Sequence, residues 1–323
     1  MIEGAPIPDA PDLSRMRRER FAKLQAGLER FGKDAALLLG SGSVAYAAGA
    51  TSPGLDSGLA ALSRPVALVV RGDPFPHVWT PYPEGLPDEL PSEFAHPATY
   101  PASPDGAAWL ADEITQLVGP GARLACDELT HPLRSRLAAF DISSASALLG
   151  TAKLCKTPDE LACIRTAQRI NELAMSEVLP LLRPGVRQSD LTGVFLKRIF
   201  ELGATANSID PIWQPMPMSK KDGPWTTHGG VAFPTPSTDT VLRDGDVLWV
   251  DTGIQYLGYA SDFGRTWIVG AHTKRPSGQQ VAQFERWMKV VSEALSLCKP
   301  GATALELGRA AAAANGGTKP WLE

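Results

Sequence analysis

The first half of the chain alternates between helical and extended patterns of hydrophobic residues. Phe21, Leu24, Leu28 and Phe31 recur at helical spacing and predict a helix over residues 15–31. Short apolar runs predict strands at residues 35–39, 66–70 and 123–126, and residues 107–117 predict another helix. This alternation is typical of an α/β layer. The proline-dense segment 74–104 predicts an irregular surface connection.

A glycine-containing segment, Gly40 to Ala45, follows the first predicted strand. It resembles a dinucleotide-binding turn only in part, because Ala60 and Ala61 stand where a ribose-binding acid is needed. The segment therefore predicts a tight strand-to-helix turn.

A helix start marks the beginning of the second half. Thr157, Pro158 and Glu160 form a capping box with proline at the first helical position. A break follows at Pro184-Gly185, and apolar residues at helical spacing predict a second helix over residues 189–202. We therefore expect one domain over residues 1–153 and another over residues 154–323.

The most informative segment of the second domain is a hairpin that carries two aspartates. Residues 247–250 and 259–269 predict strands, with a turn near Leu257-Gly258. With the tip between Tyr256 and Leu257, Asp251 and Asp262 lie directly opposite each other, with Cβ atoms ~5 Å apart. Two carboxylates so close repel each other unless a proton or cation lies between them. The spacing indicates a divalent-metal site; the alternative is a pair of solvated aspartates on an exposed face.

These residues resemble the creatinase, prolidase and aminopeptidase P group of metallopeptidases (family M24). The residues that carry the resemblance are Gly245-Asp246, the strand Val247 to Val250, Asp251, Gly253, Gly258-Tyr259, Ser261-Asp262 and Arg265-Thr266. Lys156 to Glu160 and Arg183 to Val186 are similar to segments that open the catalytic domain of the family. The resemblance implies a creatinase-like α/β N-terminal domain (1–153) followed by an α+β pita-bread catalytic domain (154–323).

The resemblance also implies a chemistry. Asp251 and Asp262 are expected to bind a divalent metal, with two ions in intact relatives, and the donors suit manganese, cobalt or zinc. The family places a catalytic histidine upstream of the first aspartate, and His228 is the candidate here. Short peptides, often with proline after the scissile bond, are the expected substrate, and a homodimer is the expected assembly. Trp213, Trp225 and Trp249 are candidates for a substrate pocket, although Trp249 is expected in the core.

The family completes its metal centre with a histidine and two glutamates downstream of the second aspartate. The residues available after Asp262 stand outside those motifs: His272, Glu285, Glu293, Glu306 and Glu323. Residues 179–191 align with residues 295–307, Pro-Gly on Pro-Gly, at a constant offset of 295 − 179 = 116. We therefore expect a catalytic domain that is truncated and incomplete in its second half, and a chain that is inactive by itself. The alternatives are a metal-free, creatinase-like C–N hydrolase and a non-catalytic binding scaffold on the same fold.

Composition excludes several other classes of function. The net charge is −4 with 44% hydrophobic residues, and no basic cluster recommends a nucleic-acid partner. No apolar stretch reaches membrane-spanning length, and the N-terminus lacks the hydrophobic core of a signal peptide. The four cysteines show no CxxC spacing. We expect a cytoplasmic protein with no membrane and no nucleic-acid partner.

Overall fold

The computed structural model describes residues 10–53, 63–216, 240–270 and 276–318. The chain divides into two compact units. The first runs up to Ala167 and includes Tyr256–Tyr259, and the second contains Gln168–Gln255 and the chain from Ala260 onward. The expected domain boundary after residue 153 stays a prediction. Within the described ranges, no helix combines the length and apolar character needed to cross a bilayer.

The first unit is built on a mixed sheet, with the described strands in the order β4-β3-β2-β1-β5-β6. β1 pairs antiparallel with β2 and parallel with β5, so it lies in the interior of the sheet. All of β1 is buried, as expected for a strand covered on both faces. The bounds are β1 Ala35–Leu38, β2 Val66–Val70, β3 His77–Trp79, β4 Ala95–His96, β5 Arg123–Cys126 and β6 Asp141–Ser144.

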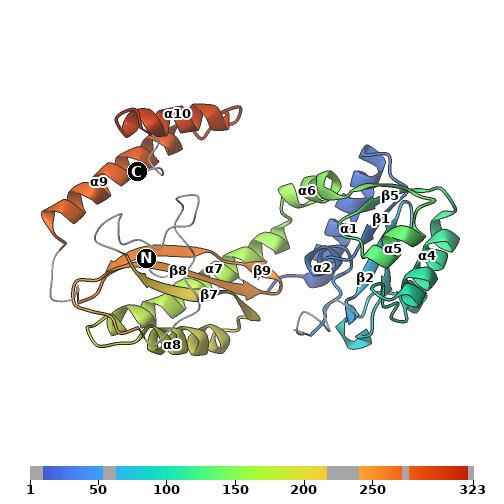
Figure 1. The fold of residues 1–323 in the computed structure, drawn as a ribbon, viewed down its shortest axis with the longest axis horizontal. Helices are drawn as coiled ribbons and strands as arrows, with labels where there is room; N and C mark the ends of the chain where they lie inside the picture. The colour runs from blue at the N-terminus through green and yellow to red at the C-terminus, as the bar shows by residue number, and fades with distance from the viewer. Residues whose placement is uncertain (1–9, 54–62, 217–239, 271–275, 319–323) are drawn as a thin grey trace. The chain divides into compact units, whose positions relative to one another are not determined.

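Helices cover both faces of this sheet (Figure 1). Ala36 and Leu38 face a core shared with α1, α2 and α6, whereas Ala35 and Leu37 face a core shared with α4 and α5. The predicted α/β N-terminal layer is therefore confirmed as a three-layer arrangement. The bounds are α1 Leu13–Arg30, α2 Ser41–Ala48, η1 Pro83–Gly85, η2 Ser92–Phe94, α4 Pro104–Val118, α5 His131–Arg136 and α6 Ser146–Leu154.

The turn after β1 leads directly into α2, as predicted. The carboxylate of Asp127 accepts hydrogen bonds from the backbone N–H groups of Leu39 (2.9 Å) and Gly40 (3.1 Å). A Cβ atom at Gly40 would lie 2.8 Å from Asp127 Oδ2, so the close approach requires glycine. The Asp127 carboxylate thus occupies the backbone N–H groups that a bound anion such as a phosphate would need.

The predicted irregular connection over residues 74–104 is interrupted by two short strands, β3 and β4, which the prediction missed. Their side chains form a compact group: His77 Nδ1 lies 2.9 Å from His96 Nε2, and the rings of Trp79 and His96 stack at 4.7 Å. Packing between residues far apart in sequence thus forms strands in a segment whose prolines indicate a loop.

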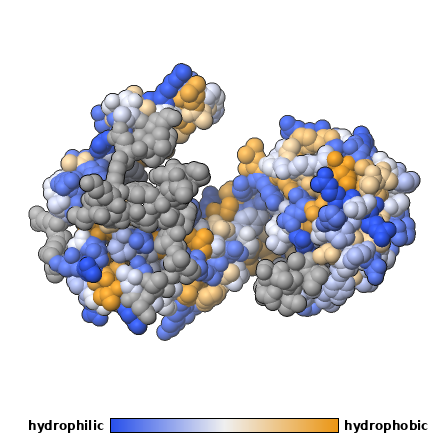
Figure 2. Space-filling view, in the orientation of Figure 1, coloured by the Kyte–Doolittle hydropathy of each residue, from blue (hydrophilic) through white to orange (hydrophobic). Residues whose placement is uncertain are grey.

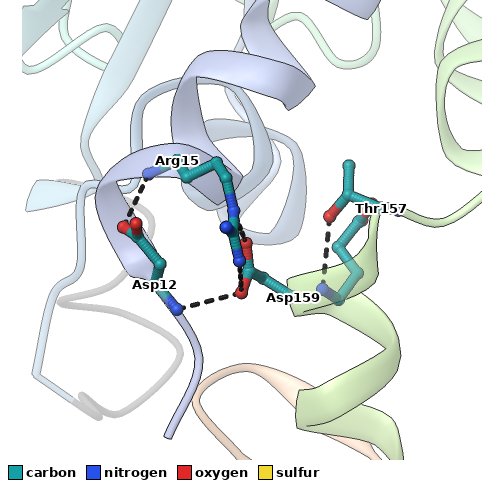
Figure 3. A network of polar contacts seen from close by, with 5 residues as sticks. Asp12, Arg15, Thr157 and Asp159 are labelled. Atoms are coloured by element: carbon teal, nitrogen blue, oxygen red, sulfur yellow. Dashed lines mark hydrogen bonds and ion pairs between the residues drawn. The ribbon is translucent and has the colours of Figure 1, made fainter.

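The start of α7 (Pro158–Val178) is fixed by two sets of hydrogen bonds (Figure 3). The predicted capping box is confirmed: the backbone N–H of Thr157 donates to Glu160 Oε2 at 2.7 Å, and that of Glu160 donates to Thr157 Oγ1 at 3.2 Å. Asp159 accepts two hydrogen bonds from the Arg15 guanidinium, both 2.8 Å long, and one from the backbone N–H of Asp12. Helix α7 is therefore anchored to α1 at its first turn.

Removing the charge of Asp159 should make the melting temperature less dependent on pH in the acidic range. The hydrogen bonds from Arg15 lower the pKa of the Asp159 carboxyl, so its ionised form stabilises the fold above the ordinary pKa of ~4. This stabilisation is lost as the pH falls through the lowered pKa. We expect Asp159→Asn to melt at a lower temperature than the wild type at pH 7, with a difference that narrows below about pH 4. Circular dichroism melting curves test this, and a difference that does not change with pH contradicts it.

The second unit is organised around an antiparallel sheet in the order β10-β8-β7, with β9 paired to β8. Leu248, Val250, Thr252 and Ile254 alternate along β8 and are buried. The buried face of α8 includes Phe195, whose ring meets that of Trp213 edge-on at 6.2 Å. Helix α7 begins in the first unit, to which the hairpin tip also belongs. The elements after α7 are η3 Leu179–Leu181, α8 Gln188–Glu201, β7 Ala206–Pro215, β8 Val247–Tyr256, β9 Tyr259–Ala260, β10 Phe263–Ile268, α9 Gly278–Ser296 and α10 Ala304–Ala314.

The internal repeat predicted from the sequence is present as repeated local structure. Gly185 and Gly301 have φ values of 91° and 93°, a left-handed conformation that favours glycine. Helices α8 and α10 begin at equivalent positions, and in each an acidic residue three positions into the helix, Asp190 or Glu306, accepts from the backbone N–H of the N-cap residue. On α9 and α10, several large hydrophobic side chains are exposed, including Phe284 at 59% and Trp287 at 56%. Figure 2 shows orange, hydrophobic residues at the surface of this part of the chain. The segments around Gly185 and Gly301 thus share their backbone geometry, but the apolar side chains of the second segment are more exposed.

Candidate metal centre

The hairpin that carries the two aspartates turns one residue later than expected. Leu257 and Gly258 form the tip, with φ values of 50° and 83°. Positive φ at both central positions is typical of the two-residue turn whose twist matches that of the paired strands. The register follows from this tip: Asp251 lies opposite Gly264, and Thr252 lies opposite Phe263. The expectation that Asp251 and Asp262 are directly opposed was therefore wrong.

The two aspartates nevertheless lie on one face of the hairpin. Asp262 precedes Gly264, the partner of Asp251, by two residues, so it is the diagonal neighbour of Asp251. Trp249 alternates with the buried Val250 and shares the face of Asp251; it is half-buried and so lies outside the core where it was expected. The register places both carboxylates on the face opposite the buried side chains of β8.

The charges of the two aspartates interact. Burial, and then the negative charge of Asp262, raise the pKa of the Asp251 carboxyl. A divalent cation between the carboxylates would relieve this repulsion, and carboxylate oxygens are suitable donors for such ions. In the part of the chain that the structure describes, no group of three or more His, Cys, Asp and Glu residues could hold a metal ion. Among the described residues, the donors that this hairpin offers to a metal are therefore the carboxylate oxygens of Asp251 and Asp262.

Gly253 allows the strands around the site to approach closely. A Cβ atom at this position would lie 2.2 Å from Ser208 Oγ and 3.1 Å from the carbonyl oxygen of Ser261. Gly253 pairs with Ile209 of β7, next to irregularities in the register of that strand. A side chain here would displace the backbone that precedes Asp262, which explains the glycine between the two aspartates.

The sequence did not reveal one buried polar residue beneath the hairpin, Asn171 of α7. Its Nδ2 donates to the carbonyl oxygen of Thr252 at 3.1 Å and to Ser261 Oγ at 3.0 Å. Its Oδ1 accepts from Thr252 Oγ1 at 2.9 Å. The available signal was an asparagine between Ile170 and Ala174, within the apolar stripe of α7.

The candidate catalytic residue His228 lies outside the described residues, as do Trp225 and His272. Trp213 is 2% exposed and donates from Nε1 to Thr192 Oγ1 at 2.9 Å. It is therefore a core residue of the second unit, which argues against a place in a substrate pocket.

Comparison with known sequences finds relatives of the second half of the chain. Residues 162–315 match the model of metallopeptidase family M24. Xaa-Pro aminopeptidase of Escherichia coli K12 is 26% identical over 155 residues, which cover 48% of this chain and 32% of that protein. Methionine aminopeptidase 1 of Saccharomyces cerevisiae is 25% identical over 150 residues, covering 46% and 36%. The chain thus spans about a third of the length of these curated relatives.

Solved structures share the fold over most of the chain. A prolidase from Thermococcus sibiricus aligns with a TM-score of 0.72 at 20% identity, covering 93% of this chain and 77% of that one. An Xaa-Pro dipeptidase from Bacillus anthracis aligns with a TM-score of 0.67 at 22% identity, covering 92% and 76%. The predicted α/β plus pita-bread architecture is therefore confirmed; at these identities the likeness establishes the fold alone.

Proposed function

We propose that this chain, whose residues 162–315 match the model of metallopeptidase family M24, provides the paired aspartates of a divalent-metal-dependent peptidase of the Xaa-Pro dipeptidase and aminopeptidase type. The observation that carries the proposal is the pair Asp251 and Asp262 on one face of a hairpin, with the pKa of Asp251 raised partly by the charge of Asp262. Two anions held together in this way provide a site for a cation.

The residues of the chain would act by binding and positioning. Asp251 and Asp262 would hold manganese, cobalt or zinc through carboxylate oxygens, with two ions in the complete centre. When bound, such ions activate water and polarise the carbonyl group of a peptide. His228 remains our candidate for stabilising the negative charge that develops on the substrate oxygen. We further propose short peptides as substrates, a homodimeric assembly and a cytoplasmic location.

We expect the 323-residue chain by itself to bind metal weakly and to lack peptidase activity. The pair of aspartates supplies two ligand side chains, and the family's downstream histidine and glutamate motifs have no counterpart in the printed sequence. The test combines calorimetric titration of the purified chain with Mn(II) and assays of Gly-Pro and Leu-Pro hydrolysis. Weak Mn(II) binding without hydrolysis is the expected result. Efficient Mn(II)-dependent hydrolysis would contradict the expected inactivity, and absence of any binding would contradict the metal site.

The metal-free alternatives make a different prediction. A creatinase-like hydrolase or a binding scaffold has no need for a second carboxylate whose charge raises the pKa of Asp251, so the Asp251–Asp262 pair favours the metallopeptidase. In a titration, either alternative would show no uptake of Mn(II), Co(II) or Zn(II) at this hairpin.

A further inference from the structure

We propose that Asn171 is a positioning residue for the metal centre, which holds Asp251 and Asp262 at a fixed separation from beneath the sheet. The inference rests on the proposed function, because it assigns Asn171 a role toward the metal that the two aspartates would bind. Asn171 contacts neither carboxylate. It acts through Thr252 and Ser261, which are the chain neighbours of Asp251 and Asp262.

The strand that pairs with β8 is interrupted between β9 and β10, where Asp262 lies. β9 ends at Ala260 and β10 begins at Phe263, so Ser261 and Asp262 lie outside the regular strands. On the other strand, Asp251 and Thr252 lie within β8. Regular strand pairing therefore fixes the first aspartate, whereas Asp262 lies between the two strands and is preceded by one backbone hydrogen bond, from the Ser261 N–H to the Ile254 carbonyl oxygen at 2.9 Å.

The amide of Asn171 spans this interruption. Its two N–H groups reach the Thr252 carbonyl on one strand and Ser261 Oγ on the other, and its oxygen accepts from the Thr252 hydroxyl. Ser261 Oγ also accepts from the backbone N–H of Ile254 at 3.1 Å. One side chain thus ties residue 252 to residue 261, and the backbone carries that constraint directly to Asp251 and Asp262.

The hydrogen-bond network of Asn171, Thr252 and Ser261 is buried, which makes these bonds effective. Asn171 and Thr252 are both 0% exposed and Ser261 is 7% exposed. In such an environment a buried polar group that loses its partner is unfavourable, so the network strongly prefers one geometry. Thr252 and Ser261 meet Asn171 on the helix side of the hairpin, whereas the register places the two aspartates on the other side. The carboxylate oxygens therefore take no part in the hydrogen-bond network of Asn171, Thr252 and Ser261, which we call the clasp.

The internal repeat shows that a helix at this place in the fold does not itself require asparagine. At the repeat offset of 116 residues, the position of Asn171 is taken by Trp287 on α9. A helix that precedes the Pro-Gly turn therefore forms without asparagine at this place. What distinguishes the first helix is the aspartate-bearing hairpin that Asn171 contacts.

The expected consequence of losing the clasp is weaker metal binding. Outer residues that orient metal ligands typically contribute 10–100-fold to affinity, so we expect Asn171→Leu to weaken Mn(II) binding by roughly that factor. Ser261→Ala is a milder second variant that serves if Asn171→Leu does not fold. It removes the two hydrogen bonds that Ser261 Oγ accepts, from Asn171 and from Ile254, and should weaken binding by about fivefold or more.

Met175→Ala is the matched control. Met175 is buried one turn further along α7, and its side chain cannot replace the hydrogen bonds of Asn171. This substitution should lower the melting temperature by creating a cavity but should leave Mn(II) affinity unchanged. The first measurement is calorimetric titration of the wild-type chain and the three variants with Mn(II). The second is hydrogen exchange of the metal-free proteins at the backbone N–H groups of residues 252–262.

The clasp is supported by weaker Mn(II) binding and faster exchange in Asn171→Leu but not in Met175→Ala. Wild-type affinity in Asn171→Leu would overturn it, as would equal weakening in both variants. If the wild-type chain binds no Mn(II), the proposed function fails, and hydrogen exchange alone decides on the clasp. Faster exchange at the hairpin in Asn171→Leu than in Met175→Ala would then support the clasp, and equal exchange would overturn it.

Discussion

Asp251→Asn should lower the affinity of the chain for Mn(II) by about 100-fold or more. The substitution removes one of two anionic ligands, and its effect should exceed the 10–100-fold typical of residues that only orient ligands. The amide retains the shape of the carboxyl group but carries no charge, so the remaining attraction for a cation comes from Asp262. Calorimetric titration with Mn(II) measures the loss. Asp112→Asn, which makes the same charge change at an exposed position of α4, should bind Mn(II) as the wild type does.

Without metal, the Asp251→Asn variant should be at least as stable as the wild type, although it binds Mn(II) more weakly. Because burial and Asp262 raise the pKa of Asp251 in the folded state, its ionisation opposes folding as the pH rises through that raised value. Asp251→Asn removes this penalty, so its melting temperature at pH 7 should equal or exceed that of the wild type without metal. A variant that binds Mn(II) normally, or one that melts well below the wild type, would contradict this account of the pair.

Glu160→Ala should destabilise the first unit by about 3–5 kcal/mol, the usual result of breaking a buried charge network. Glu160 is 2% exposed and accepts from the Tyr259 hydroxyl at 2.8 Å. That hydroxyl in turn accepts from Arg20, which is 6% exposed and also lies over the ring of Tyr46. Without Glu160, the buried Arg20 guanidinium loses the carboxylate that it reaches through the Tyr259 hydroxyl, and Lys23 loses its ion pair with Glu160 at 3.7 Å. The start of α7 also loses the carboxylate that caps Thr157.

Urea denaturation measures this loss of unfolding free energy. Glu29→Ala removes the same charge from an exposed position of α1 and should change the unfolding free energy by less than about 0.5 kcal/mol. Glu160→Gln retains an oxygen that can accept from Tyr259 and should fall between Glu160→Ala and the wild type. If Glu160→Ala unfolds at the same urea concentration as the wild type, the buried network does not contribute to stability.

The sequence alone determined the features that depend on neighbouring residues. The capping box at Thr157, the turn at Gly40 and the Pro-Gly repeat at positions 185 and 301 follow from local backbone chemistry. The paired aspartates could also be assigned to one hairpin, because apolar strands around a Gly-containing turn are a local signal. His228 was identified through the family resemblance and stays a prediction.

Tertiary structure decided the features that depend on contacts between distant residues. The register of the hairpin follows from Leu257 taking positive φ, an uncommon conformation for leucine that its apolar character does not predict. Strands β3 and β4 form because side chains 19 residues apart pack together, despite the prolines between them. Asn171 reaches residues 81 and 90 positions away, and such partners leave no periodic trace in the sequence. Local propensity therefore places the two aspartates on a hairpin, while long-range packing and hydrogen bonding determine how they face each other.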